Sequence, residues 1–94
     1  MTMQERYAAA NAIEDSTRRN IALALLEAEH TINYHTKETE TARAQIELMA
    51  SQPSTPGYAD AIEGSLRNWR LAYANLERAH YTQQLLIRLQ DTPA

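Results

Sequence analysis

The stretch IALALLEAEHTINYHTKETETARAQIELM, residues 21–49, carries apolar or small side chains at alternating spacings of four and three residues. The nine positions of this series are Ile21, Leu25, Ala28, Ile32, His35, Thr39, Ala42, Ile46 and Met49. An average repeat of 3.5 residues is typical of helices that wind around each other in a left-handed coiled coil, and no β-strand produces it. The stretch therefore predicts a long helix whose nine repeated positions form a packed seam.

A second series of the same kind follows in IEGSLRNWRLAYANLERAHYTQQLLI, residues 62–87. Its predicted seam positions are Ile62, Leu66, Trp69, Tyr73, Leu76, His80, Gln83 and Ile87. The segment SQPSTPG, residues 51–57, separates the two series, and its two prolines and one glycine stop any helix from crossing it. The chain is therefore predicted to be all-α, with the two long helices packed as an antiparallel, coiled-coil-like hairpin.

The 94 residues are sufficient for one small helical domain covering residues 1–94. We expect a short helix over residues 3–14, and the first long helix over 17–51. A loop over 52–55, the second long helix over 56–90 and a tail over 91–94 complete the predicted chain. The charged segment 14–19 interrupts the apolar pattern. Either the helix bends there, or Asp15 or Ser16 caps a new helix after a short first one.

Composition excludes several classes of protein. The absence of cysteine excludes disulfides, thiolate metal sites and cysteine nucleophiles, and it fits a cytoplasmic location. No run approaches the 18 apolar residues that a membrane-spanning helix needs, and the N-terminal residues do not resemble a secretory signal. The net charge of −3 argues against a binder of duplex nucleic acid. We expect neither a membrane nor duplex nucleic acid as a partner, and no cofactor.

Apolar side chains are in surplus near the open end of the predicted hairpin, outside its seam. They are Leu23, Leu26, Tyr81, Leu85, Leu86 and Leu89. Leaving such side chains in water forgoes roughly 1.5 to 3 kcal/mol each and favours aggregation. We expect them to be covered by the short first helix and by a second copy of the chain. The most direct assembly is a two-fold dimer that completes a four-helix bundle.

Polar side chains occur within the predicted seam. They are His35, Thr39, Tyr73 and His80. A buried polar layer must satisfy its hydrogen bonds, and it can fix the register and number of packed helices. We expect this structural role, with a pH switch based on the histidines as the alternative.

The spacing Glu-x-x-His occurs twice, from Glu27 to His30 and from Glu77 to His80. Three residues are nearly one helical turn, so each pair can present a carboxylate and an imidazole to one metal ion. These few residues resemble the ligand pattern of ferritin-like di-iron carboxylate bundles. The resemblance implies a di-metal site, here at a dimer interface, as an alternative function.

Arginine and aromatic side chains alternate along the second long helix, which offers another alternative. Arg67, Arg70, Arg78 and Tyr81 would hold a small ligand or nucleotide by its phosphate and its base. Gly57 and Gly64 are the only glycines, so no phosphate-binding loop is present. No serine has a histidine within reach on the same helix, so hydrolytic catalysis is not expected.

The leading hypothesis is a non-enzymatic helical module for protein–protein interaction, such as an adaptor, assembly factor or inhibitor, that acts as a homo-oligomer. Leu85, Leu86 and Leu89 would anchor the partner. Acidic residues flank the helices and favour a partner with a basic surface. They are Glu27, Glu38, Glu40 and Glu47.

Overall fold

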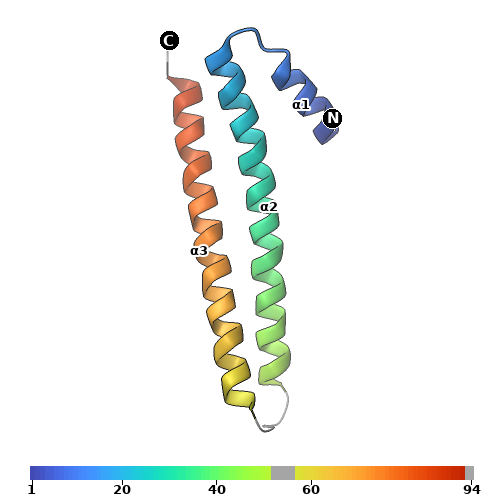
Figure 1. Cartoon of the computed structure of the whole chain (residues 1–94), viewed down its shortest axis with the longest axis vertical. Helices are drawn as coiled ribbons and strands as arrows, with labels where there is room; N and C mark the ends of the chain where they lie inside the picture. The colour runs from blue at the N-terminus through green and yellow to red at the C-terminus, as the bar shows by residue number, and fades with distance from the viewer. Residues whose placement is uncertain (52–56, 93–94) are drawn as a thin grey trace. The chain divides into compact units, whose positions relative to one another are not determined.

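The computed structural model describes residues 1–51 and 57–92, which form three α-helices and no strand (Figure 1). Helix α1 spans Met3–Asn11, α2 spans Ser16–Ala50 and α3 spans Tyr58–Asp91. The all-α prediction is confirmed for these residues. The predicted loop at 52–55, the predicted helix start at residue 56 and tail residues 93–94 lie outside them. Within the described ranges, no helix is both long enough and apolar enough to cross a bilayer.

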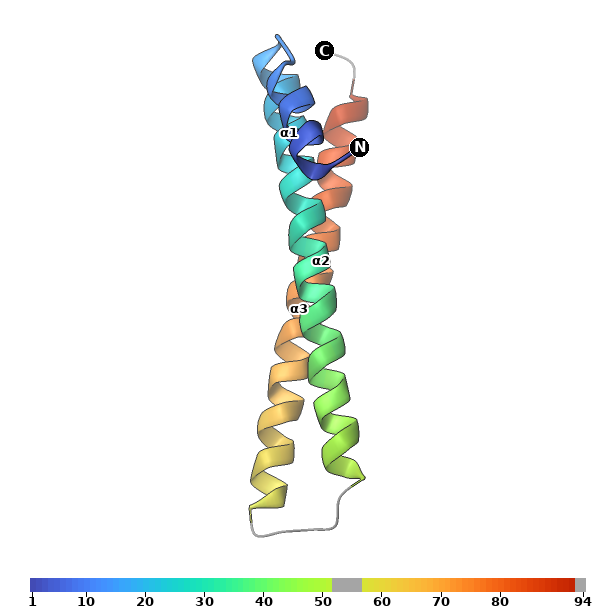
Figure 2. The same ribbon diagram turned by 90° about the vertical axis from the view of Figure 1, so that its right-hand side faces the viewer.

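The described residues belong to two compact units. The terminal unit contains residues 1–32 and 79–92, and the central unit contains residues 33–51 and 57–78. In each unit the segments of α2 and α3 lie side by side and run antiparallel, as both views of the ribbon show (Figures 1 and 2). The helical hairpin predicted from the two apolar series is therefore present.

Two polar side chains define where α1 and α2 begin. The Thr2 hydroxyl accepts a hydrogen bond from the Glu5 amide at 3.1 Å and donates one to the Glu5 carboxylate, so Thr2 caps α1. The Asp15 carboxylate accepts a hydrogen bond from the Arg18 amide at 2.8 Å, so it caps α2. Residues 12–15 therefore separate two helices, and residues 16–19 of the charged segment form the first turn of α2, so the interruption is a break and not a bend. Helix α1 ends at Asn11, three residues before the predicted end, because the chain must turn to bring Asp15 into the capping position.

In the central unit, the last turn of α2 is connected to the start of α3. The Tyr58 hydroxyl donates a hydrogen bond of 2.6 Å to the carbonyl of Met49. Gly57 precedes α3 with a φ of +84°, a left-handed conformation that glycine adopts without steric cost. Helix α3 begins at the next residue, two residues after the predicted start.

The packed face of α2 is the one that the sequence predicts. None of its nine seam positions, from Ile21 to Met49, is exposed in the structure. Ala28 is buried and the other eight are partly shielded. The 4,3 spacing was therefore sufficient to place this face.

The packed face of α3 differs from the prediction by one residue at every second position. The shielded residues include a series with 3,4 spacing: Ile62, Ser65, Trp69, Ala72, Leu76, Ala79, Gln83 and Leu86. The predicted seam residues Leu66, Tyr73, His80 and Ile87 are exposed. The contrast is sharpest at two neighbours, because Ala72 is 3% exposed and Tyr73 is 48% exposed. Ser65, Ala72 and Ala79 are small enough for two helix backbones to approach closely, so the seam includes them and leaves the larger neighbours on its edge.

Candidate interaction surface

Helix α1 folds back onto α2 in the terminal unit and covers part of the predicted apolar patch (Figures 1 and 2). Leu26 is only 7% exposed there, and Ala10 of α1 is buried as well. A shallow cavity of about 420 Å³ remains, lined by both helices and by Gln83 and Gln90 of α3. Leu26 therefore belongs to the core beneath α1 and not to an exposed patch.

An ion pair connects α1 to α2. The Arg6 guanidinium donates two hydrogen bonds to the Glu29 carboxylate, Nη1 to Oε1 at 2.9 Å and Nη2 to Oε2 at 2.5 Å. The hydrogen bonds from Arg6, assisted by its charge, lower the pKa of the Glu29 carboxyl, and partial burial opposes this shift. The same contacts raise the pKa of Arg6. The Arg19 guanidinium of α2 also donates a hydrogen bond to the carbonyl of Ile13, a residue of the linker between α1 and α2.

We expect the docking of α1 to weaken in acid. Because the pKa of Glu29 is lowered in the folded protein, the stabilisation is complete above the ordinary carboxyl pKa of 4.5 and is lost as the pH falls through the folded-state pKa. Hydrogen exchange of the α1 amides, corrected for intrinsic rates, should show loss of protection at low pH. This loss should be smaller in Glu29→Gln, whereas the exposed control Glu27→Gln should behave as wild type. The same acid response in Glu29→Gln would contradict the assignment.

Three of the four α3 residues of the predicted patch are exposed. Tyr81 is 61% exposed, Leu85 is 40% exposed and Leu89 is 56% exposed. Their spacing of four residues places them along one face of α3. Leu23 and Leu86 are partly shielded. We call Tyr81, Leu85 and Leu89 the terminal patch.

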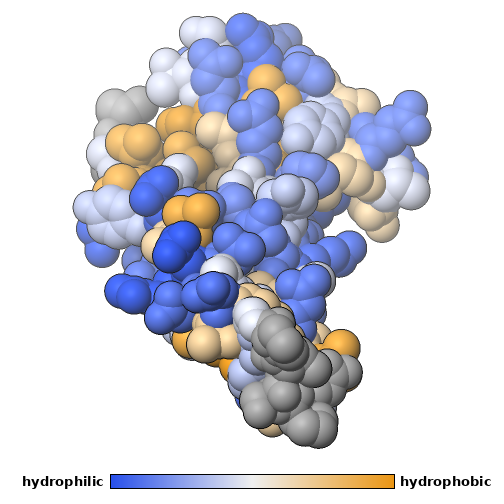
Figure 3. All heavy atoms as spheres, turned by 60° about the horizontal axis from the view of Figure 1, so that its bottom comes forward, coloured by the Kyte–Doolittle hydropathy of each residue, from blue (hydrophilic) through white to orange (hydrophobic). Residues whose placement is uncertain are grey.

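Apolar side chains also reach the surface elsewhere. Figure 3 shows them as separate patches among hydrophilic residues on the face in view. Leu48, Leu71, Tyr34 and Tyr73 are exposed large side chains of the central unit. The terminal patch differs from these because three apolar residues follow each other on successive turns of one helix.

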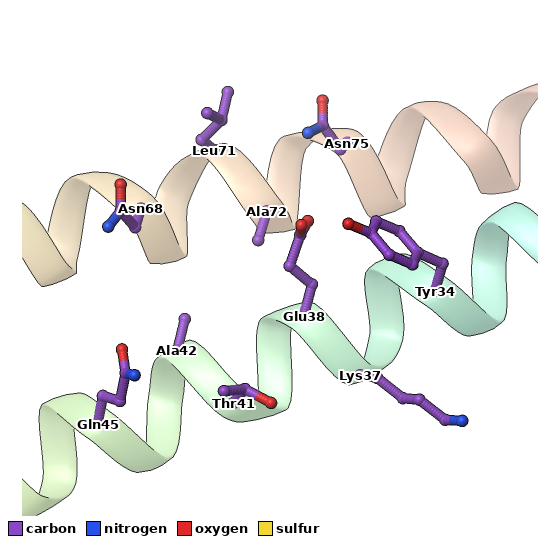
Figure 4. Close-up of a pocket in the computed structure, with 10 residues that line it drawn as sticks. All are labelled: Tyr34, Lys37, Glu38, Thr41, Ala42, Gln45, Asn68, Leu71, Ala72 and Asn75. Carbon is purple, nitrogen blue, oxygen red and sulfur yellow. The ribbon is translucent and has the colours of Figure 1, made fainter.

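A groove of about 590 Å³ lies between α2 and α3 in the central unit. Ala42 and Ala72 point toward each other across it, whereas Lys37 and Leu71 point away (Figure 4). Its other lining residues are uncharged except for one carboxylate: Tyr34, Glu38, Thr41, Gln45, Asn68 and Asn75. This set has neither a nucleophile with a base nor an arrangement of metal ligands.

Of the four predicted polar seam residues, only His35 and Thr39, which lie on α2, are shielded in the structure. His35 Nδ1 lies 3.2 Å from Glu38 Oε1, and the Thr39 hydroxyl donates a hydrogen bond of 2.7 Å to the His35 carbonyl. Tyr73 and His80 are exposed on α3, because the neighbouring alanines occupy the seam. Both of these contacts of His35 are local to α2, so they do not join the two long helices.

The residues proposed for metal and ligand binding lie at the surface. Glu27, His30, Glu77 and His80 are all exposed. In residues 1–51 and 57–92, no group of three or more histidine or acidic side chains is placed to hold a metal ion. Arg67, Arg70, Arg78 and Tyr81 are exposed as well and line neither cavity described above. The structure therefore adds no observation in favour of either alternative.

Sequence reasoning missed three features of the terminal unit. The Thr2 cap of α1 and its contact with Glu5 follow an S/T-x-x-E spacing, so a scan for that signature would have found the cap. The Arg6–Glu29 pair joins residues 23 positions apart, and no local pattern predicts it. The burial of Leu26 follows from the same docking of α1.

Comparison of the chain with protein-family models, with curated proteins and with solved structures found no match, so the fold and the terminal patch are the basis for proposing a function.

Proposed function

We propose that this chain is a non-enzymatic helical module for protein–protein interaction, acting as an adaptor, assembly factor or inhibitor. The observation that supports it is the terminal patch, three large side chains on successive turns of α3 that are each 40 to 61% exposed. A regular helical face of this kind fits a groove or another helix of a partner protein. Tyr81 adds an aromatic ring with a polar tip, which is common at interfaces.

Charge indicates the kind of partner. The terminal unit contains six acidic and four basic side chains. Glu27 is exposed on α2 in this unit. The resulting net charge of −2 on this unit favours encounter with a basic protein over an acidic one. We therefore propose a partner with a basic surface.

We also propose that the chain acts as a homo-oligomer, most simply a two-fold dimer that forms a four-helix bundle. Only five residues of the described chain are buried apolar ones, and four of these are alanines. A core of this size contributes little hydrophobic stabilisation. Small domains often gain the stability that their core does not supply by association with another chain. A second copy would cover part of the exposed apolar surface.

Replacing Leu85 and Leu89 together with aspartate tests the interaction proposal. Both side chains are substantially exposed, so the variant should keep its helical circular dichroism and its thermal unfolding. We expect the amount of specific partner retained in pull-downs from native-host cells to fall by roughly tenfold or more, because charges would replace the apolar anchors.

Leu48→Asp is the matched control, since Leu48 is an exposed leucine outside the terminal patch. This control should retain the partner as wild type does. A photocrosslinker placed at residue 85 should label the same partner, whereas one at residue 48 should not. Equal retention by all three proteins would contradict the proposed surface.

A further inference from the structure

Helix α3 carries two overlapping heptad series in the central unit. Both include Ile62, Trp69 and Leu76. The series with Ser65 and Ala72 is shielded in the structure, whereas the series with Leu66 and Tyr73 lies along its edge. A helix with two such series offers packing faces to two neighbouring helices. Helix α2 is one neighbour, and within the described part of the chain the second face has none.

The second face combines apolar surface with incomplete packing. Leu66 and Tyr73 are both more than one third exposed. The Trp69 ring centroid lies 5.9 Å from that of Tyr73, and the buried Trp69 Nε1 has no hydrogen-bond partner. A buried donor without a partner is costly, and in a native protein it calls for an explanation. We define the second seam as Leu66, Trp69 and Tyr73.

The charges beside the second seam are self-complementary. Arg70 and Glu77 are seven residues apart, so they lie on the same edge of α3, and both are exposed. Neither forms an ion pair with any residue that the structure describes. If two copies of α3 lie antiparallel about a two-fold axis near Tyr73, Arg70 faces the partner's Glu77 and Glu77 faces the partner's Arg70. Two-fold symmetry thus doubles each favourable contact.

We propose that the second seam binds the second seam of another copy of this chain, with the two α3 helices antiparallel and the two-fold axis near Tyr73. This inference rests on the homo-oligomer of the proposed function and names its interface. Tyr73 packs against the partner's Tyr73 at the centre, and the Arg70–Glu77 contacts fix register and direction. The two hairpins then form the four-helix bundle.

Charge reversal tests both the interface and its direction. In Arg70→Glu alone, two like-charge contacts replace two attractive ones, and the same is true of Glu77→Arg alone. Each single variant should dimerise roughly tenfold more weakly than wild type in analytical ultracentrifugation. An equimolar mixture of the two variants should recover the dimer, because each chain then meets its opposite charge. The double variant should dimerise like wild type.

Arg67→Glu is the matched control, because Arg67 is exposed on α3 but does not face Glu77 in this register. It should dimerise as wild type does. Circular dichroism checks that each variant folds, which we expect because the altered residues are exposed. Trp69, the only tryptophan, gives a second readout, since its emission should change when the wild-type dimer is diluted.

Three outcomes would overturn the inference, and they separate it from the proposed function. A wild-type chain that stays monomeric at all accessible concentrations would remove both the interface and the homo-oligomer, while the test of the terminal patch would stand. Single variants that dimerise as wild type would place the dimer on another surface and leave the homo-oligomer intact. A mixture that fails to recover the dimer would overturn the antiparallel register.

Discussion

Replacing Ala72 with aspartate is expected to unfold this protein or to bring it close to unfolding. Ala72 is 3% exposed in the seam of the central unit and has Ala42 of α2 opposite it. A carboxylate there loses its hydration, and the one cationic residue of the groove, Lys37, points away from it, so the substitution costs about 3 kcal/mol or more. Because small domains have only about 5 to 15 kcal/mol of total stability, the loss should be evident in urea denaturation followed by circular dichroism.

Tyr73→Asp provides the comparison for this prediction. Its position is one residue away and 48% exposed, so the aspartate remains in water and the free energy of unfolding should change by less than about 1 kcal/mol. Both variants should be measured at the lowest workable protein concentration, where self-association contributes least to stability. If Tyr73→Asp were the more damaging variant, the packed face of α3 would be the one predicted from the sequence and not the one observed.

Leu26→Ala is expected to cause the second large loss, of about 2 to 3 kcal/mol in the free energy of unfolding. The side chain is 7% exposed beneath α1, so its removal leaves a cavity that adds to the shallow one already present. Because α1 is only nine residues long, it is too short to be stable as an isolated helix and depends on this contact. Hydrogen exchange should therefore show that the α1 amides lose protection before those of α2.

Leu48→Ala is the matched control for Leu26→Ala, since it makes the same substitution on the same helix at an exposed position. Its effect should stay within about 0.5 kcal/mol. Similar losses in the two variants would indicate that α1 does not cover Leu26 in solution.

The sequence predicted the packed face of α2 better than that of α3. On α2, the residues beside the seam are mostly polar, so the spacing of the apolar positions leaves one choice of face. On α3, Ala72 is followed by the larger side chain of Tyr73, and Ser65 is followed by the larger side chain of Leu66. Selecting the larger side chains gives Tyr73 and Leu66, whereas close approach of two helices selects their small neighbours. Only the packed structure decides between these two criteria.

The exposure of the six apolar residues near the open end could be predicted only in part, for a related reason. Leu85 and Leu89 are exposed as their distance from the seam suggested, but Leu26 is covered by α1. The sequence gives no register for the docking of α1, because that docking depends on Arg6 meeting Glu29 and on Ala10 becoming buried. These contacts join segments that are distant along the chain.

The sequence alone determined that the chain is helical, that a seam runs along α2 and that segments 14–19 and 51–57 interrupt the pattern. These properties are local: they follow from a 3.5-residue repeat, from polar capping residues such as Asp15, and from proline and glycine. The tertiary structure decided which edge of α3 faces α2 and which leucines α1 covers. Those choices depend on side-chain volume and on contacts between distant segments, which periodicity along the chain does not encode.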